Sequence, residues 1–169
     1  MSEQERQRDD EARKLAQREF DRPLVVEAGA GTGKTAVLTS RVVAWVLGPG
    51  WERAAQAGET ADKTARRVLS GVAAITFTEA AAAEMAIRIE GALSGVEEGR
   101  SEPWLDEEAL PAESVRIDRA RALREALDHL TVRTIHAWCR TATMTATKPQ
   151  RMPTMNYHRA ARAALRHRQ

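Results

Sequence analysis

The sequence is poor in cysteine and in aromatic residues. It contains one Cys and 4% aromatic residues among 169 residues. The single thiol, Cys139, excludes an internal disulfide and a zinc site built from several cysteines, and we expect it to be buried as a small apolar side chain. The scarcity of aromatic residues, together with 30% charged residues and abundant alanine, favours a helix-rich α/β protein over a β-sandwich.

Long hydrophobic runs are also missing. No stretch approaches the ~18 consecutive apolar residues that a membrane-spanning helix needs. The charged N-terminal segment lacks the apolar centre of a signal peptide. We therefore predict a cytoplasmic protein without a membrane partner, and the length fits one domain.

Acidic residues are absent from the C-terminal part of the chain. Residues 140–169 contain seven Lys or Arg residues and no Asp or Glu, whereas the preceding part carries an excess of acids. A basic segment of this kind can bind phosphate backbones without sequence preference, but it is also typical of a terminus that binds nothing. We predict a domain over residues 1–140 and a basic tail, disordered or aberrant, over residues 141–169.

Helical and strand patterns alternate along the domain. A polar helix is predicted within residues 1–22, ending before Pro23. Bounded apolar runs predict three strands, over residues 23–29, 72–77 and 131–135. A helical pattern follows each strand, beginning near Gly33, Thr78 and His136. Because repeated strand–helix units form parallel sheets, we predict an α/β fold with a parallel sheet and helices on both faces.

The helix after the first predicted strand is amphipathic. Its apolar residues recur at spacings of three and four and are Val37, Leu38, Val42, Trp45 and Val46. The Gly-Pro-Gly that begins at Gly48 should end this helix. Residues 51–70 are predicted to hold one short helix and a loop, and residues 96–112 a loop.

The segment that precedes this helix reads AGAGTGKT and resembles a phosphate-binding loop of the pattern G-x-x-x-x-G-K-[ST]. Its residues are Ala28, Gly29, Ala30, Gly31, Thr32, Gly33, Lys34 and Thr35. Small residues let backbone N–H groups turn toward an anion, and the helix N-terminus adds positive charge. Lys34 would neutralise the β- and γ-phosphates, and the Thr35 hydroxyl would ligate Mg²⁺. The segment predicts binding of ATP and Mg²⁺, with Lys34 and Thr35 in catalytic positions; the alternative is a glycine-rich turn without a ligand.

Three segments together resemble one family. AGAGTGKT at 28–35, ITFTEAAAAEM at 75–85 and TIHAWC at 134–139 are similar, in this order, to motifs of the UvrD/RecB-type superfamily 1 DNA helicases, above all of the RecB/AddA branch. The resemblance implies a partial RecA-like P-loop NTPase domain. It also implies ATP-dependent translocation on single-stranded DNA in repair or recombination, in partnership with a nuclease or recombination subunit.

The resemblance assigns DNA contacts to the second and third segments. Thr76, Phe77 and Thr78 would touch single-stranded DNA, as would His136. From the residues alone, Phe77 is as well placed in an apolar core, Thr78 can be a helix N-cap, and His136 can be an ordinary surface residue. The resemblance also suggests Gln17 as the residue that contacts adenine.

The machinery for hydrolysis is incomplete in this sequence. ATP hydrolysis needs an acid pair, usually at the end of an apolar strand, and arginines that stabilise the γ-phosphate. The nearest candidate, PWLDEEALP around Asp106, is typical of an acidic loop instead. We therefore predict the ATP-binding portion of a DNA helicase, truncated and inactive alone. A small P-loop kinase, a non-catalytic nucleic-acid-binding module and a fragment without a stable fold are the alternatives.

Overall fold

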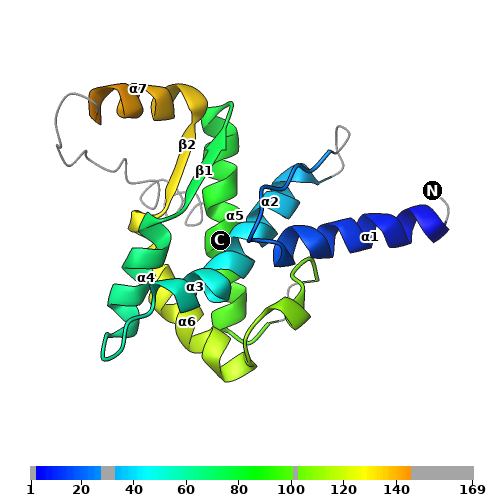
Figure 1. Cartoon of the computed structure of the whole chain (residues 1–169), viewed down its shortest axis with the longest axis horizontal. Coiled ribbons are helices and arrows are strands. Elements are labelled where there is room, and N and C mark those ends of the chain that lie inside the picture. Colours follow the sequence, from blue (N-terminus) through cyan, green and yellow to red (C-terminus); the bar gives the residue numbers. More distant parts are fainter. Residues whose placement is uncertain (1–2, 28–32, 101–102, 146–169) are drawn as a thin grey trace, which may run out of the picture.

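The computed structural model describes residues 3–27, 33–100 and 103–145. Over these ranges the chain is helix-rich, with a small parallel sheet (Figure 1). The helices are α1 (Glu3–Arg18), α2 (Lys34–Leu47), α3 (Pro49–Ala54), α4 (Ala61–Ser70), α5 (Glu79–Glu97), α6 (Glu113–Glu125) and α7 (Ile135–Thr145). The strands are β1 (Ala73–Thr76) and β2 (Thr131–Thr134), and the short 3₁₀ helices are η1 (Glu107–Ala109) and η2 (Leu127–His129).

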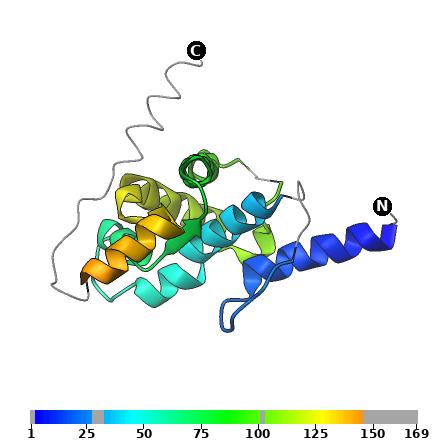
Figure 2. The ribbon, with the colours of Figure 1, turned by 90° about the horizontal axis from the view of Figure 1, so that it is seen from above.

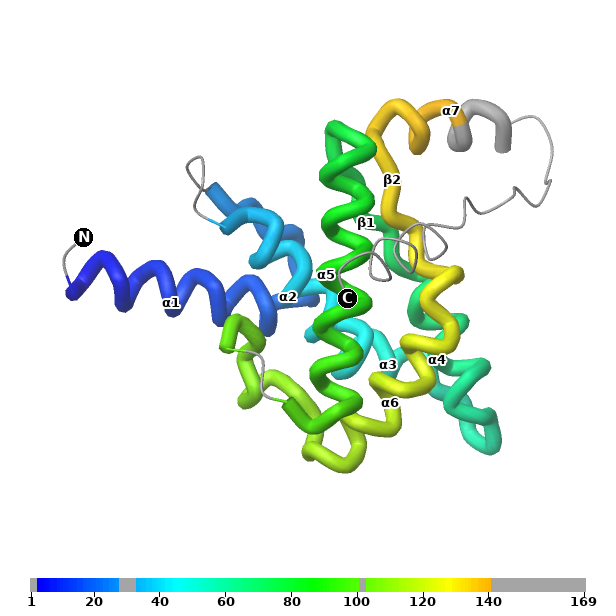
Figure 3. The backbone as a smooth tube through the Cα atoms, turned by 180° about the vertical axis from the view of Figure 1, so that it is seen from behind, coloured from blue at the N-terminus to red at the C-terminus, as the bar shows by residue number. Residues whose placement is uncertain are grey.

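Helix α5 passes through the middle of the molecule and packs against α2 and α6 (Figure 3). The core forms where the apolar faces of α2, α4, α5 and α6 meet. Its largest fully buried apolar side chains are Val43, Val46, Leu47, Leu69, Ile89, Leu93 and Leu123. Because each such side chain contributes about 1.5–3 kcal/mol on burial, this helical cluster is the main source of stability.

Helix α1 projects away from the core (Figures 1 and 2). Its buried residues are Ala16 and Gln17, near its C-terminal end, where it meets α2. The helix predicted within residues 1–22 is confirmed for the part that α1 covers.

The sheet has one covered face and one open face. Ala74 pairs with Val132, and Thr76 pairs with Thr134; this face is the more buried one and α5 contacts both strands. The opposite face includes Ile75, which is 42% exposed. The prediction of helices on both faces is therefore wrong for the described residues, since their sheet has only two strands and one of its faces is partly exposed.

The first predicted strand is not formed over its described residues, 23–27. Residues 23–27 have no strand structure, and Val25 is 85% exposed. A strand needs a neighbour for its backbone N–H and C=O groups, and the sheet of the described residues contains β1 and β2 alone. The second and third predicted strands are confirmed as β1 and β2, so the predicted three-stranded sheet is reduced to two.

The apolar stripe of α2 divides between core and surface. Val46 is fully buried, whereas Leu38 is 47% exposed and Val42 and Trp45 are half-buried. The helix ends at Leu47, as predicted. The next helix, α3, begins at once because proline is favourable in the first turn of a helix.

The remaining boundaries follow the sequence pattern closely. Residues 51–70 hold the end of α3 and the whole of α4, and η1 lies within the loop predicted over residues 96–112. Helix α7 continues across residue 140 as far as Thr145. Residues 146–169 lie outside the described ranges, so the division into a domain and a basic tail stays a prediction. In the part of the chain that the structure describes, no helix is both long enough and apolar enough to cross a membrane.

Candidate nucleotide and nucleic-acid sites

The predicted phosphate loop leads directly into α2. Gly33 precedes the helix with φ of 83°, a left-handed conformation that favours glycine. The helix begins at Lys34, and its first turn contains no acidic residue, so the positive end of the helix dipole is not offset there. Lys34 is exposed and Thr35 is half-buried. Residues Ala28, Gly29, Ala30, Gly31 and Thr32 lie outside the described ranges.

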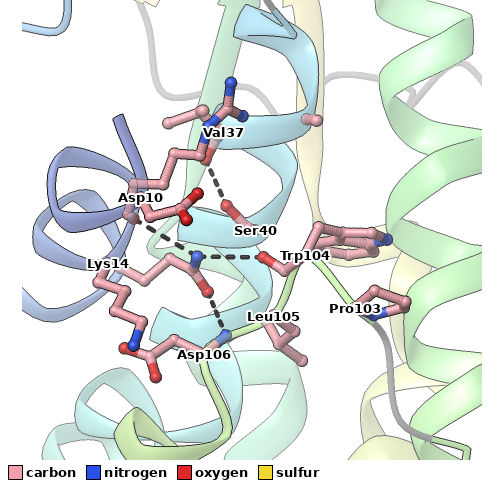
Figure 4. Close-up of a pocket in the computed structure, with 11 residues that line it drawn as sticks. Asp10, Lys14, Val37, Ser40, Pro103, Trp104, Leu105 and Asp106 are labelled. Carbon is pink, nitrogen blue, oxygen red and sulfur yellow. Dashed lines mark hydrogen bonds between the residues drawn. The ribbon is translucent and has the colours of Figure 1, made fainter. Parts of the chain in front are cut away.

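A cavity of about 310 Å³ lies beside this helix, between α1, α2 and the segment 103–106 (Figure 4). Its walls carry cations, acids and apolar residues, among them Arg13, Lys14, Asp10, Asp106, Val37 and Trp104. A volume of this size is at the lower end of ligand-binding cavities in proteins. The cavity therefore offers cations and apolar surface within reach of the loop end.

Arg13 reaches toward the end of the phosphate loop. Its Nη1 atom lies 3.5 Å from the position that a Cβ atom on Gly33 would occupy. Its Nε atom donates to Asp9 Oδ2 at 2.8 Å, one helical turn earlier on α1. This ion pair orients the guanidinium group toward α2, so α1 contributes positive charge to the region around Gly33.

Gln17 forms part of the cavity wall, but its side chain also fixes the segment opposite. Its Nε2 atom donates to Trp104 O at 3.1 Å, and its Oε1 atom accepts from Asp106 N at 2.8 Å. The residue is buried. Both ends of the amide are therefore engaged by backbone atoms, which gives Gln17 a structural role; its predicted contact with adenine stays a prediction.

Asp106 is held in a bidentate ion pair. Arg18 donates from Nε to Oδ2 at 2.5 Å and from Nη2 to Oδ1 at 3.0 Å, and it also reaches Glu108. These hydrogen bonds hold the pKa of the Asp106 carboxyl group below its usual value, although partial burial opposes the shift. The pair ties α1 to the segment before η1. Asp106 does not end a strand, which agrees with the interpretation of PWLDEEALP as an acidic loop.

The two segments predicted to touch DNA meet at the carboxyl ends of the strands. The parallel register places Thr76 of β1 beside Thr134 of β2. Phe77 and Thr78 follow β1 directly, and His136 lies in the first turn of α7 directly after β2. Residues that are 58 positions apart, such as Thr78 and His136, are thus brought to the same edge of the sheet.

Threonine hydroxyls organise this edge. Thr78 Oγ1 accepts from Ala81 N at 3.1 Å and caps α5, which confirms the N-cap predicted for this residue. Thr134 Oγ1 accepts from Ala137 N at 3.3 Å and donates to Glu79 Oε1 at 3.2 Å. The acid lies in the first turn of α5, whereas the first turn of α7 has no acid. A phosphate group is therefore favoured at the start of α7 over the start of α5.

The exposure of the side chains at this edge shows which of these residues lie in the core and which lie on the surface. Phe77 is 84% exposed, so its placement in an apolar core is wrong. His136 is exposed. Cys139 on α7 is exposed as well, which corrects the prediction of a buried thiol. The physical reason is that α7 contacts the strands at one end of the sheet and leaves much of its own surface uncovered.

Comparison with known proteins defines the family. The sequence pattern of the UvrD/REP helicase N-terminal domain matches residues 9–163. The chain belongs to this family. The match of the UvrD/REP domain includes both α2 and the strand ends described above, so the resemblance of the three motifs is confirmed at the level of the family.

A helicase/nuclease subunit is also similar to this chain in sequence. This relative is an ATP-dependent helicase/nuclease subunit of Clostridium botulinum (strain Loch Maree / Type A3), and it is 34% identical over 119 residues, which make up 69% of this chain and 7% of the relative. This chain thus spans a small part of that relative's length. No solved structure matches the chain significantly.

Several residues of these sites escape sequence reasoning. Arg13, Trp104 and the Arg18–Asp106 pair become neighbours of the predicted nucleotide site only through packing of α1 against the rest of the chain. The spacing of Asp9, Arg13 and Gln17 along one helical face is the only sequence signal that points to them. Within the described ranges, no group of three or more His, Cys, Asp or Glu side chains could hold a metal ion. The role of Thr35 as a Mg²⁺ ligand stays a prediction.

Proposed function

We propose that this chain is the ATP-binding and DNA-contacting portion of a DNA helicase. Membership of the UvrD/REP family supports the proposal. The observation on which it chiefly depends is the parallel register of β1 and β2, because it brings the two segments that are predicted to contact DNA to one edge of the sheet. In this proposal the fold corresponds to part of a RecA-like P-loop domain.

The nucleotide would bind at the start of α2. Its phosphates would contact the backbone of residues 28–33 and Lys34, and Thr35 would ligate Mg²⁺. The base would enter the cavity between α1, α2 and Trp104, where Gln17 could exchange one of its backbone partners for adenine. The negative charge of the phosphates would be offset by Arg13 and by the positive end of the α2 dipole.

Single-stranded DNA would run across the carboxyl ends of β1 and β2. The exposed ring of Phe77 offers a surface for stacking against a base, and the start of α7 near His136 offers N–H groups to a phosphate. Thr76 and Thr78 lie between these two points and would position the backbone of the DNA.

We infer that this polypeptide alone hydrolyses ATP negligibly. Neither strand of the described residues ends in an acid, since β1 ends at Thr76 and β2 at Thr134, and Asp106, the nearest candidate, is committed to Arg18. Without an acid that orients water, positioning of the phosphates by Lys34 is insufficient for turnover. The relative named above belongs to a helicase/nuclease, and we propose by analogy that a complete protein with this domain works with a nuclease or recombination subunit.

Binding of a fluorescent ATP analogue tests the nucleotide site. Lys34→Ala should lower the affinity by about tenfold to a hundredfold, because a charged hydrogen bond to phosphate is worth ~1.5–3 kcal/mol. Lys63→Ala, at an exposed lysine of α4, serves as the matched control and should leave the affinity unchanged. Equal affinities for Lys34→Ala and the unaltered protein would refute the site. Release of phosphate with DNA-stimulated turnover would contradict the inferred lack of hydrolysis.

Fluorescence anisotropy with a labelled single-stranded oligonucleotide tests the DNA site. Phe77→Ala should weaken binding by about fivefold or more, since stacking on an aromatic ring contributes ~1–3 kcal/mol per base. Ile87→Ala changes an apolar residue of α5 that is 40% exposed and lies away from the strand ends, and it should bind like the unaltered protein. If both variants bind equally well, Phe77 has no part in DNA binding.

A further inference from the structure

The hydroxyl group of Thr134 joins the starts of two helices. Its Oγ1 atom accepts from Ala137 N in the first turn of α7 at 3.3 Å and donates to Glu79 Oε1 in the first turn of α5 at 3.2 Å. Both helices begin at the same end of the strands (Figure 1), although Glu79 and Thr134 are 55 positions apart in the sequence. A side chain of α5 is therefore linked to the helix that follows the other strand.

Glu79 determines how this hydroxyl group is used. A threonine hydroxyl has one proton to donate and two lone pairs that accept, whereas a carboxylate only accepts. Glu79 therefore takes the proton and leaves the lone pairs of Oγ1 for the N–H of Ala137. Thr134 is 5% exposed, so water has little access to compete for its hydroxyl group. The cap of α7 is thus oriented from the start of α5.

Helix α7 is only partly covered by the rest of the described chain. It packs chiefly against β1 and β2, and the side chains of Ile135 and Trp138 are 42% and 38% exposed. Because burial contributes less here than in the core helices, hydrogen bonds contribute a larger share of what fixes its N-terminus. That N-terminus carries the N–H groups and the His136 side chain that are proposed to meet a DNA phosphate.

We propose that Glu79 is a positioning residue of the DNA site, which holds the start of α7 in place relative to the start of α5 through Thr134. The inference rests on the proposed binding of single-stranded DNA and adds a residue that does not itself touch the DNA. The link sets the separation between the start of α7, which would meet a phosphate, and Phe77, which would meet a base. A site whose groups are held in place before the ligand arrives binds more tightly, because less conformational entropy is lost on binding.

The charge of Glu79 and its hydrogen bond have opposite effects on DNA affinity. Glu79 is exposed, and a carboxylate near a phosphate repels it, so removal of the charge alone should strengthen binding. Loss of the hydrogen bond should weaken binding. Glu79→Gln removes the charge and keeps an oxygen that accepts from Thr134, whereas Glu79→Ala removes both. Because both variants lose the charge, the ratio of their affinities isolates the hydrogen bond.

Fluorescence anisotropy with a labelled single-stranded oligonucleotide measures this ratio on the full chain. Glu79→Ala should bind about threefold to tenfold more weakly than Glu79→Gln, the range that one hydrogen bond contributes. When the chain also carries Thr134→Val, the two variants should bind equally, because the linking hydroxyl group is gone. Glu84→Ala and Glu84→Gln are the matched control, since Glu84 is an exposed acid of the same helix that pairs with Arg88; these two should bind equally.

Amide hydrogen exchange without DNA tests the link itself. Exchange at Ala137 should be about threefold or more faster in Glu79→Ala than in Glu79→Gln, and circular dichroism establishes that all variants are folded. Equal DNA affinities or equal exchange rates for the two variants would overturn the proposal, as would an affinity difference that persists with Thr134→Val. Absence of DNA binding by the unaltered chain would instead refute the proposed function on which the inference rests.

Discussion

Arg41 shows how one side chain joins two helices. Its guanidinium group donates to the carbonyl oxygens of Ala16 and Glu19 at the end of α1, where a helix has unpaired acceptors and the negative end of its dipole. The same group stacks over Phe20. Because α2 carries this residue, the helix that follows the phosphate loop is fastened to the helix that carries Arg13 and Gln17.

Replacement of Gln17 tests its structural role. Gln17→Ala should lower the free energy of unfolding by about 1–3 kcal/mol, because Trp104 O and Asp106 N would lose a buried partner. Gln17→Glu keeps the acceptor for Asp106 N but places a buried carboxylate against Trp104 O, so a loss at least as large as that of Gln17→Ala is expected. Urea unfolding measures both. A variant Gln17→Ala as stable as the unaltered protein would show that the clamp contributes nothing.

The ion pair of Arg18 and Asp106 should make stability depend on pH. The pKa of Asp106 is lower in the folded chain than in the unfolded chain, so its stabilising contribution is present above the unfolded value of about 3.9 and is lost as the pH falls through the folded value. Asp106→Asn should therefore flatten the decline of stability below about pH 5.

The exposed ion pair of Arg66 and Asp62 on α4 provides the control for that experiment. Its partners lie one helical turn apart and are about half exposed, whereas the Asp106 side chain is 4% exposed. Exposed pairs of this kind contribute little to stability. Urea titrations at several pH values should separate Asp106→Asn from Asp62→Asn; identical profiles for the two variants would contradict the assignment.

The helices that begin at the carboxyl ends of the strands are capped differently from the rest. α5 begins with a side-chain cap from Thr78, and the first turn of α7 receives one from Thr134. Thr60, the N-cap residue of α4, forms no capping hydrogen bond with its side chain. Capping therefore fixes the start of the two helices that adjoin the proposed DNA contacts.

Thr78→Ala should lower the free energy of unfolding by about 1 kcal/mol, because the N–H of Ala81 loses its acceptor. Thr60→Ala removes the same atoms from a threonine that makes no capping bond, and it should cost less. Thermal or urea unfolding without DNA gives the comparison. Equal losses for the two variants would show that the cap of α5 is not formed.

The two proposed sites lie at the periphery of a helical core. The core joins α2, α4, α5 and α6, and it holds the start of α2 and the ends of β1 and β2 in fixed positions. The residues that form the core are thus distinct from exposed site residues such as Lys34 and Phe77. Substitutions in the centre should unfold the chain, whereas substitutions such as Phe77→Ala should leave it folded.

Leu93→Ala tests the dependence of the fold on this core. Leu93 is fully buried in α5, and its truncation should cost about 2–5 kcal/mol from lost burial and the cavity that remains. Since a small domain has ~5–15 kcal/mol in total, this loss removes a large share of the stability and should lower the melting temperature by several degrees or more. Val115→Ala, at a residue that is 39% exposed, is the control. A cooperative melt unchanged by Leu93→Ala would contradict the packing of α5 in the core.

The sequence alone determined the features that depend on neighbours in the chain. Glycine at position 33 permits the turn into α2, Thr78 caps α5, and the apolar runs around Ile75 and Val132 form strands, because each depends on local geometry and spacing. Membership of the helicase family likewise follows from short motifs and was confirmed.

Only the tertiary structure decided which of these elements find partners. Residues 23–27 have the composition of a strand but lack a neighbouring strand, Leu38 belongs to an apolar stripe but faces a groove, and Cys139 lies on an uncovered helix surface. Gln17 and Asp106 are 89 positions apart and meet through packing alone. Burial and pairing depend on contacts between distant segments, and spacing along the chain does not specify those contacts.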